Sequence, residues 1–180
     1  MRILVAPGAS GRAGSMSAHV DGLVERGFAA RAIDLPLRKA ERAVSVYREH
    51  VEAQGLTASE LAVSGQSYGG RVASLLAAEP EPACAALVCF SYPLHRPGQP
   101  DWEVRSAHWP AIDVPVLLLS GESDPFARLD LLRRAVGERL PSARLVTYPK
   151  VGHSLKPVLD AALDEVAAFL RPLDAASEGG

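Results

Sequence analysis

Short apolar runs alternate with segments of helical periodicity along most of the chain. The apolar runs predict six strands, at residues 3–6, 28–34, 61–64, 86–90, 116–120 and 144–148. The helical spacing predicts helices at residues 16–26, 41–53, 128–139 and 157–170. Because most of the strands are apolar along their whole length, we predict an α/β fold in which helices cover both faces of a parallel sheet.

The run at residues 28–34 differs from the others because Arg31 interrupts its apolar pattern. A charged residue in the middle of a strand is typical of a sheet edge, where it discourages pairing with another chain. An ordinary strand end explains the same residue equally well. An exposed edge is also a candidate surface for a homodimer, although Arg31 disfavours direct strand pairing.

The length and composition predict a single domain. The chain has 180 residues, of which 48% are hydrophobic, and a domain of this size can bury a substantial core. The alternating pattern assigns residues 1–171 to this domain. The small and polar residues that follow predict a disordered tail at 172–180.

Charge and residue types exclude several classes of partner. The net charge is −2 and no basic stripe is present, so we expect no nucleic-acid partner. No apolar run reaches the length of a membrane span and the first residues lack a signal-peptide pattern, which predicts a cytoplasmic protein without a membrane partner. Cys84 and Cys89 are predicted to be reduced, buried thiols. The five histidines are scattered, so we expect no metal site and no cofactor.

The most informative motif lies within residues 61–70. An apolar run leads into Gly65-x-Ser67-x-Gly69, and a small, apolar stretch of helical spacing follows at residues 71–78. This is the strand, tight turn and helix of a nucleophile elbow, which holds a serine hydroxyl clear of the backbone. Side chains at positions 65 and 69 would collide in so tight a turn, and glycine therefore suits both. We predict Ser67 as a nucleophile, against the competing interpretation of an ordinary turn serine.

Two later loops supply the partners that a serine nucleophile needs. Serine requires a neighbouring base, and the base requires a carboxylate that orients it. Asp124 follows the strand at residues 116–120, and His153 follows the strand at 144–148. Both lie past the carboxyl ends of their strands, where parallel sheets form their active sites. A turn-forming Asp-Pro pair and a surface histidine are the competing interpretations, and Glu122, which we expect to be solvated, is the rival acid.

A tetrahedral intermediate also needs two backbone N–H donors. One is predicted at Tyr68, directly after the nucleophile, and the other in the glycine loop after the first strand. Within that loop we favour Ala9, with Ser10 as the alternative. A simple glycine turn before a helix would explain the same loop without an oxyanion role.

The segment between the fourth and fifth strands is too short for a helical cap domain, so we expect an open pocket or one that a single loop lines. Tyr92, His95 and Trp102 are candidate pocket-wall residues in this segment. Ser10 is a further candidate in the first loop. Packing of the aromatic rings beneath a loop is the alternative for each of them.

Together these motifs resemble a small α/β-hydrolase. Within that superfamily the chain is most similar to the hydrolase-like family of the NSL-complex subunit and the testis-expressed proteins, with their bacterial relatives. The similarity rests on residues 8–11, 65–70, 91–98, 114–121 with Asp124, and 152–154. The stretch 91–98 (Ser-Tyr-Pro-Leu-His-Arg-Pro-Gly) is its distinctive part. The resemblance implies a Ser-Asp-His triad at Ser67, Asp124 and His153, but no particular substrate.

The chain departs from the relatives in two ways. They often carry histidine where this chain has Pro7, and the full hydrolase fold has two more strands ahead of the run at residues 3–6. We therefore expect a minimal α/β-hydrolase fold of about six parallel strands that lacks those two strands and any cap domain.

The function predicted from these features is a serine esterase or thioesterase that acts on a small-molecule acyl substrate through an acyl-enzyme intermediate. A non-catalytic binding or scaffold protein with the same fold is the second hypothesis, and a peptidase is the third. The residues do not define the acyl chain length, the leaving group or the oligomeric state.

Overall fold

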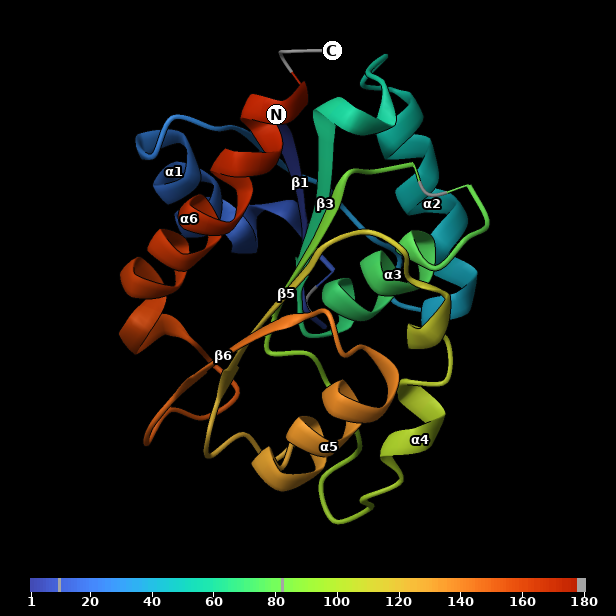
Figure 1. Cartoon of the computed structure of the whole chain (residues 1–180), viewed down its shortest axis with the longest axis vertical. Helices are drawn as coiled ribbons and strands as arrows, with labels where there is room; N and C mark the ends of the chain where they lie inside the picture. Colours follow the sequence, from blue (N-terminus) through green and yellow to red (C-terminus); the bar gives the residue numbers. More distant parts are fainter. Residues whose placement is uncertain (10, 82, 178–180) are drawn as a thin grey trace.

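Six strands form a single parallel sheet in the computed structural model, which describes residues 1–9, 11–81 and 83–177 (Figure 1). The strand order is β2-β1-β3-β4-β5-β6. The strands are β1 (Arg2–Ala6), β2 (Ala29–Ala32), β3 (Leu61–Gln66), β4 (Ala86–Phe90), β5 (Val116–Gly121) and β6 (Arg144–Tyr148). The predicted six-stranded parallel sheet is confirmed.

Helices cover both faces of this sheet. They are α1 (Ser17–Glu25), α2 (Ala40–Glu52), α3 (Tyr68–Ala77), α4 (Trp102–Arg105), α5 (Leu129–Arg139) and α6 (Leu159–Ser177). Single 3-10 turns lie at Ala13–Met16, Ala58–Glu60, Trp109–Ala111 and Lys156–Val158. Helices α1 and α6 pack together on one face, while α2, α3, α4 and α5 lie on the other (Figure 1).

The sheet divides the core into two hydrophobic clusters. In β1, Leu4 points into the cluster beneath α2 and α3, whereas Ile3 and Val5 point into the cluster beneath α1 and α6. Successive strand residues alternate between faces, and both faces are buried. This explains why the strands are apolar at nearly every position.

Strand β2 is an edge strand, as the charge at Arg31 predicts. It pairs with β1 alone, and the Arg31 side chain is exposed. A cation on an unpaired edge opposes the approach of a second strand.

The prediction of a disordered tail at 172–180 is wrong for residues 172–177, because α6 continues through Pro172 to Ser177. Leu173 packs against the same cluster as Val166 and Leu170, so the apolar stripe of the helix extends one turn further than expected. Asp174 also forms an ion pair with the N-terminal ammonium group of Met1. Residues 178–180 lie outside the described part of the chain.

Within the described residues, no helix is both long enough and apolar enough to cross a membrane.

Candidate active site

Ser67 lies in the tight turn between β3 and α3, in a strained backbone conformation. Its φ is +49° and its ψ is −114°, a combination that is costly for any residue with a side chain. The Ser67 N–H donates to the carbonyl of Phe90 at 2.8 Å, and the Ser67 carbonyl accepts from the N–H of Arg71 at 3.0 Å. These bonds hold the backbone of the turn at the carboxyl end of the sheet.

The two glycines of the turn are sterically required, as the sequence predicts. A Cβ atom on Gly65 would lie 2.4 Å from the carbonyl carbon of Gly69. A Cβ atom on Gly69 would lie 2.5 Å from the carbonyl oxygen of Pro7. The turn can therefore close only without a side chain at Gly65, and it can pack against the end of β1 only without one at Gly69.

Two hydrogen bonds join the side chains of Ser67, His153 and Asp124. The Ser67 Oγ atom lies 2.8 Å from Nε2 of His153, and His153 Nδ1 lies 2.7 Å from Oδ2 of Asp124. The three residues come from the loops after β3, β6 and β5. The fold thus brings together the three side chains that the sequence singled out, in the order hydroxyl, imidazole, carboxylate.

The surroundings of Asp124 and His153 hold both groups in place. The Asp124 side chain has no solvent exposure, and its Oδ1 atom accepts a hydrogen bond from the N–H of Phe126 at 2.8 Å. The Phe126 ring lies against the imidazole of His153, with ring centroids 4.5 Å apart. Since His153 Nδ1 faces the buried carboxylate, this nitrogen carries the proton and Nε2 is left to accept one from Ser67.

Backbone bonds tie the acid loop to the histidine loop. Ser123 N–H donates to the carbonyl of Val151 at 2.9 Å, and Glu122 N–H donates to that of Tyr148 at 3.0 Å. The rival acid Glu122 is half-buried rather than solvated, because its carboxylate accepts a hydrogen bond from the Thr147 hydroxyl at 2.8 Å. That bond commits Glu122 to β6, whereas Asp124 contacts the imidazole.

A pocket of about 730 Å³ opens at Ser67. Ala9 and Tyr68, the residues predicted to supply oxyanion donors, line it together with Ser67. The loop after β1 therefore reaches the nucleophile, as that prediction requires. The alternative donor Ser10, which was also a candidate pocket residue, lies outside the described part of the chain.

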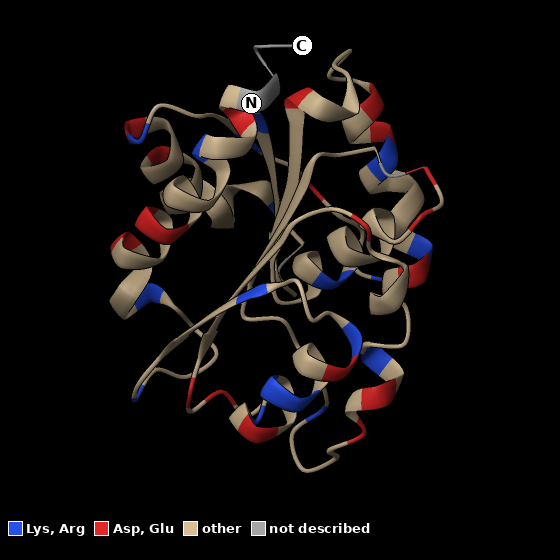
Figure 2. Cartoon of the chain, in the orientation of Figure 1, with Lys and Arg blue, Asp and Glu red and all other residues tan. Residues whose placement is uncertain are grey.

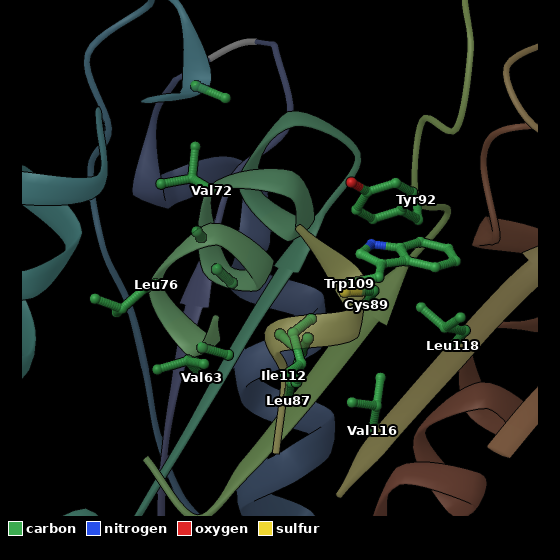
Figure 3. Packing of buried hydrophobic residues seen from close by; sticks show 14 of the residues in the cluster. Val63, Val72, Leu76, Leu87, Cys89, Tyr92, Trp109, Ile112, Val116 and Leu118 are labelled. Carbon is green, nitrogen blue, oxygen red and sulfur yellow. The ribbon is translucent and has the colours of Figure 1, made fainter. Parts of the chain in front are cut away.

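The prediction that Tyr92 and Trp102 form the pocket wall is wrong, because both rings are buried in the core. Tyr92 packs edge-on against Trp109 with centroids 5.0 Å apart, and its hydroxyl donates to the carbonyl of Arg105 (Figure 3). The Trp102 ring packs against the guanidinium groups of Arg134 and Arg139 on α5. Large rings at these positions gain more from burial than from lining an open pocket.

The same prediction is wrong for His95, which is 2% exposed and forms hydrogen bonds with the segment after Asp124. Its Nε2 atom accepts from the N–H of Arg128 at 3.0 Å, and its Nδ1 atom donates to the carbonyl of Arg96 at 2.9 Å. Its backbone N–H donates to the carbonyl of Phe126 at 2.9 Å. His95 thus fastens the crossover between β4 and β5 to the segment directly after Asp124.

The crossover does line the pocket, but through neighbours of the predicted residues. These neighbours are Pro93, Arg96, Asp101, Val104 and Arg105. The loop before α2 and the first turn of α3 contribute the cations Arg38, Lys39 and Arg71. Sequence reasoning missed all of these charges, since isolated charged residues on loops and short helices form no motif.

The chain matches a family model described as "Alpha/beta hydrolase domain" over residues 9–173. It is also similar in structure to the monoacylglycerol lipase of Paleococcus ferrophilus, with a TM-score of 0.78 and 14% identity, over 93% of this chain and 94% of that one. The esterase Pf2001 of Pyrococcus furiosus gives a TM-score of 0.78 at 16% identity, over 95% and 82% of the two chains. The protein TT1662 of Thermus thermophilus gives 0.71 at 23% identity, over 96% and 88%. At these identities the structural matches establish the fold.

Proposed function

Because the chain belongs to the alpha/beta hydrolase family, we propose that it is a serine hydrolase that cleaves a small ester or thioester through an acyl-enzyme intermediate. The observation that carries this proposal is the continuous hydrogen-bonded chain from the Ser67 hydroxyl through His153 to Asp124, with donor–acceptor distances of 2.8 and 2.7 Å. A serine on a strained turn beside an oriented imidazole has the arrangement that nucleophilic catalysis requires.

In the acylation step, Ser67 Oγ attacks the substrate carbonyl carbon while His153 Nε2 takes the hydroxyl proton. The buried Asp124 carboxylate stabilises the imidazolium that forms. The carbonyl oxygen becomes an oxyanion, for which the N–H groups of Tyr68 and Ala9 are the proposed donors. The leaving group departs with the proton from His153. A water molecule then attacks the acyl-enzyme by the same route and releases the acid.

Two considerations favour an ester over a peptide as substrate. The structural neighbours include an esterase and a monoacylglycerol lipase by name. In addition, the described residues that line the pocket at Ser67 bound a volume of about 730 Å³, which suits a small molecule. We also propose that the chain is related, within its family, to the hydrolase-like group of the NSL-complex subunit, because its stretch 91–98 resembles that group in sequence.

The proposal is tested with a fluorophosphonate probe and a series of acyl esters of graded length, with thioesters alongside. We expect rapid labelling and turnover by the native protein and neither by Ser67→Ala. Ser45→Ala, which removes an exposed hydroxyl from α2, is the matched control and should label normally. Absence of labelling in a folded sample would instead support a binding or scaffold protein with the same fold.

A further inference from the structure

The pocket at Ser67 carries a strong positive charge. Of the described residues that line it, five are cationic: Arg38, Lys39, Arg71, Arg96 and Arg105. Two lining residues, Glu41 and Asp101, are acidic. The chain as a whole has a net charge of −2. The sign of the pocket is therefore opposite to that of the molecule.

Three separate parts of the fold contribute these cations. Arg38 and Lys39 precede α2, Arg71 lies in the first turns of α3, and Arg96 and Arg105 lie in the crossover between β4 and β5. Figure 2 shows Lys and Arg segments on α2, α3, α4 and α5, with Asp and Glu segments among them. Because the segments are far apart in sequence, the fold itself creates the charged wall.

Arg71 and Arg105 are half-buried, and neither is fully satisfied by protein partners. Arg71 Nη2 donates to Glu41 at 2.6 Å, while its Nε–H is buried without a hydrogen-bond partner among the described residues. Arg105 Nη1 donates to the carbonyls of Pro93 and His95, at 2.8 and 3.3 Å. Carbonyl oxygens orient this guanidinium but do not neutralise it.

The remaining cations of the pocket are exposed. No acidic residue in the described part of the chain forms an ion pair with Arg38, Lys39 or Arg96. Burial lowers the pKa of Arg105, the charges of Arg71 and Arg96 lower it further, and the charge of Asp101 offsets part of this shift. The cations therefore repel one another across the pocket, and a bound anion would relieve that repulsion.

We propose that this pocket selects substrates that carry a carboxylate or phosphate in the acyl or leaving part, with the anion held by the cationic wall while Ser67 attacks the carbonyl. This inference rests on the proposed hydrolase function. Guanidinium groups bind both anions in a bidentate geometry, and their charge matters most in a partly enclosed site. A pocket of about 730 Å³ fits a small charged molecule.

A pair of esters of equal chain length tests the selection. The 4-nitrophenyl monoester of glutaric acid is anionic, and 4-nitrophenyl pentanoate is its neutral counterpart. We expect kcat/KM to be at least about tenfold higher for the anionic ester in low salt, a factor typical of one well-placed ionic contact. The preference should shrink as ionic strength rises, because salt screens the cluster.

Variants locate the effect in the pocket. Arg38→Gln combined with Arg96→Gln changes two exposed side chains, so the fold should be retained. The double variant should lose about tenfold in kcat/KM on the anionic ester, and this loss should exceed its loss on the neutral ester. Arg133→Gln, an exposed arginine on α5 that does not line the pocket, is the matched control and should keep the full preference. Equal kcat/KM for both esters, or equal losses in the double variant, would overturn the inference.

Calorimetric titration of Ser67→Ala separates anion binding from catalysis. Binding of glutarate that disappears in the Arg38/Arg96 double variant supports a carboxylate, and binding of inorganic phosphate that disappears there supports a phosphate. If neither anion binds, the inference fails even when both esters are hydrolysed. If an anion binds but no ester or thioester is cleaved, the proposed hydrolase fails and the anion site stands.

Discussion

Asp124 and Glu122 lie two residues apart, yet their hydrogen bonds assign them different roles. Asp124 is buried against His153, whereas Glu122 bonds to Thr147 in β6. Asp124→Asn keeps the shape of the side chain but removes the charge that orients and stabilises the imidazolium. We expect kcat on a 4-nitrophenyl ester to fall by about 10³–10⁴-fold. Glu122→Gln is the matched control, with an expected loss below about tenfold, and a larger loss in this variant would reassign the acid.

The buried His19 should make the folded protein less stable in mild acid. Burial lowers the pKa of His19 to about 4, and its Nδ1 atom has no hydrogen-bond partner among the described residues. The unfolded chain, with an ordinary histidine pKa near 6.5, binds this proton first. The contribution of neutral His19 to the free energy of unfolding is therefore complete above pH 6.5, and it is lost as the pH falls from 6.5 towards 4.

His19→Phe tests this contribution, because phenylalanine can keep the edge-on contact with Phe90. Urea unfolding at pH 7 and pH 5 should show a native protein that is about 2 kcal/mol less stable at pH 5 on account of this group. The difference between the two pH values should shrink in the variant. An unchanged difference would show that His19 does not control it.

At the residue scale, the sequence predicted the hydrogen-bonded side chains of the site better than it predicted the residues that line the pocket. Ser67 is identified by a local motif, and Asp124 and His153 by their places after buried strands. The residues that line the pocket could not be predicted in this way, because the packing of a loop decides which of its side chains face the pocket. Tyr92 and Trp102 turned inward as the large rings of the crossover, and this left its arginines on the pocket side.

At the scale of elements, close contact between two loops positions the imidazole. Gly121 ends β5, and a Cβ atom there would lie 2.2 Å from the carbonyl oxygen of Val151. Gly121→Ala should push the histidine loop away from the acid loop. We expect kcat to fall by more than about tenfold, since small displacements of catalytic groups are costly, and the unfolding midpoint to fall as well.

Gly137→Ala is the control for this prediction. Gly137 lies within α5, where an added Cβ atom would meet nothing within 4 Å. Alanine there should stabilise the protein by roughly 0.5–1 kcal/mol and leave kcat unchanged. Equal kcat values for the native protein and Gly121→Ala would show that loop contact at this glycine does not set the geometry.

Helices and strands with a clear hydrophobic pattern could be predicted from the sequence, whereas bounds that depend on tertiary packing could not. Strands β4 and β6 have the predicted bounds. Strand β4 is apolar throughout, whereas β6 begins at Arg144 and includes Thr147 among its apolar residues. Helix α4 has only four residues, which is too short for any periodicity to appear. The end of α6 was missed because Pro172 and the polar residues after it suggest a stop, while the packing of Leu173 extends the helix.

At the scale of the whole molecule, the sheet explains why the site and the core can be separated. Side chains within the strands fill two clusters, and the loops at the carboxyl ends carry Ser67, Asp124 and His153. A change in these loops can therefore remove activity without opening the core. Dimer formation through an exposed strand edge stays a prediction, and Arg31 on β2 opposes it there.

The reactivity of the two buried thiols measures whether the core stays closed when a residue of the site is changed. Cys84 and Cys89 are free and buried, and burial raises the pKa of Cys84 to about 12 and that of Cys89 further. A buried thiol that is not ionised does not react with a disulfide reagent until the structure opens. We expect 5,5′-dithiobis(2-nitrobenzoic acid) at pH 8 to modify neither cysteine in the native protein and both in urea. Ser67→Ala should show the same protection of both cysteines. That result would show that the variant loses turnover because the nucleophile is absent. Rapid modification of the folded variant would instead show that the substitution disturbs the core.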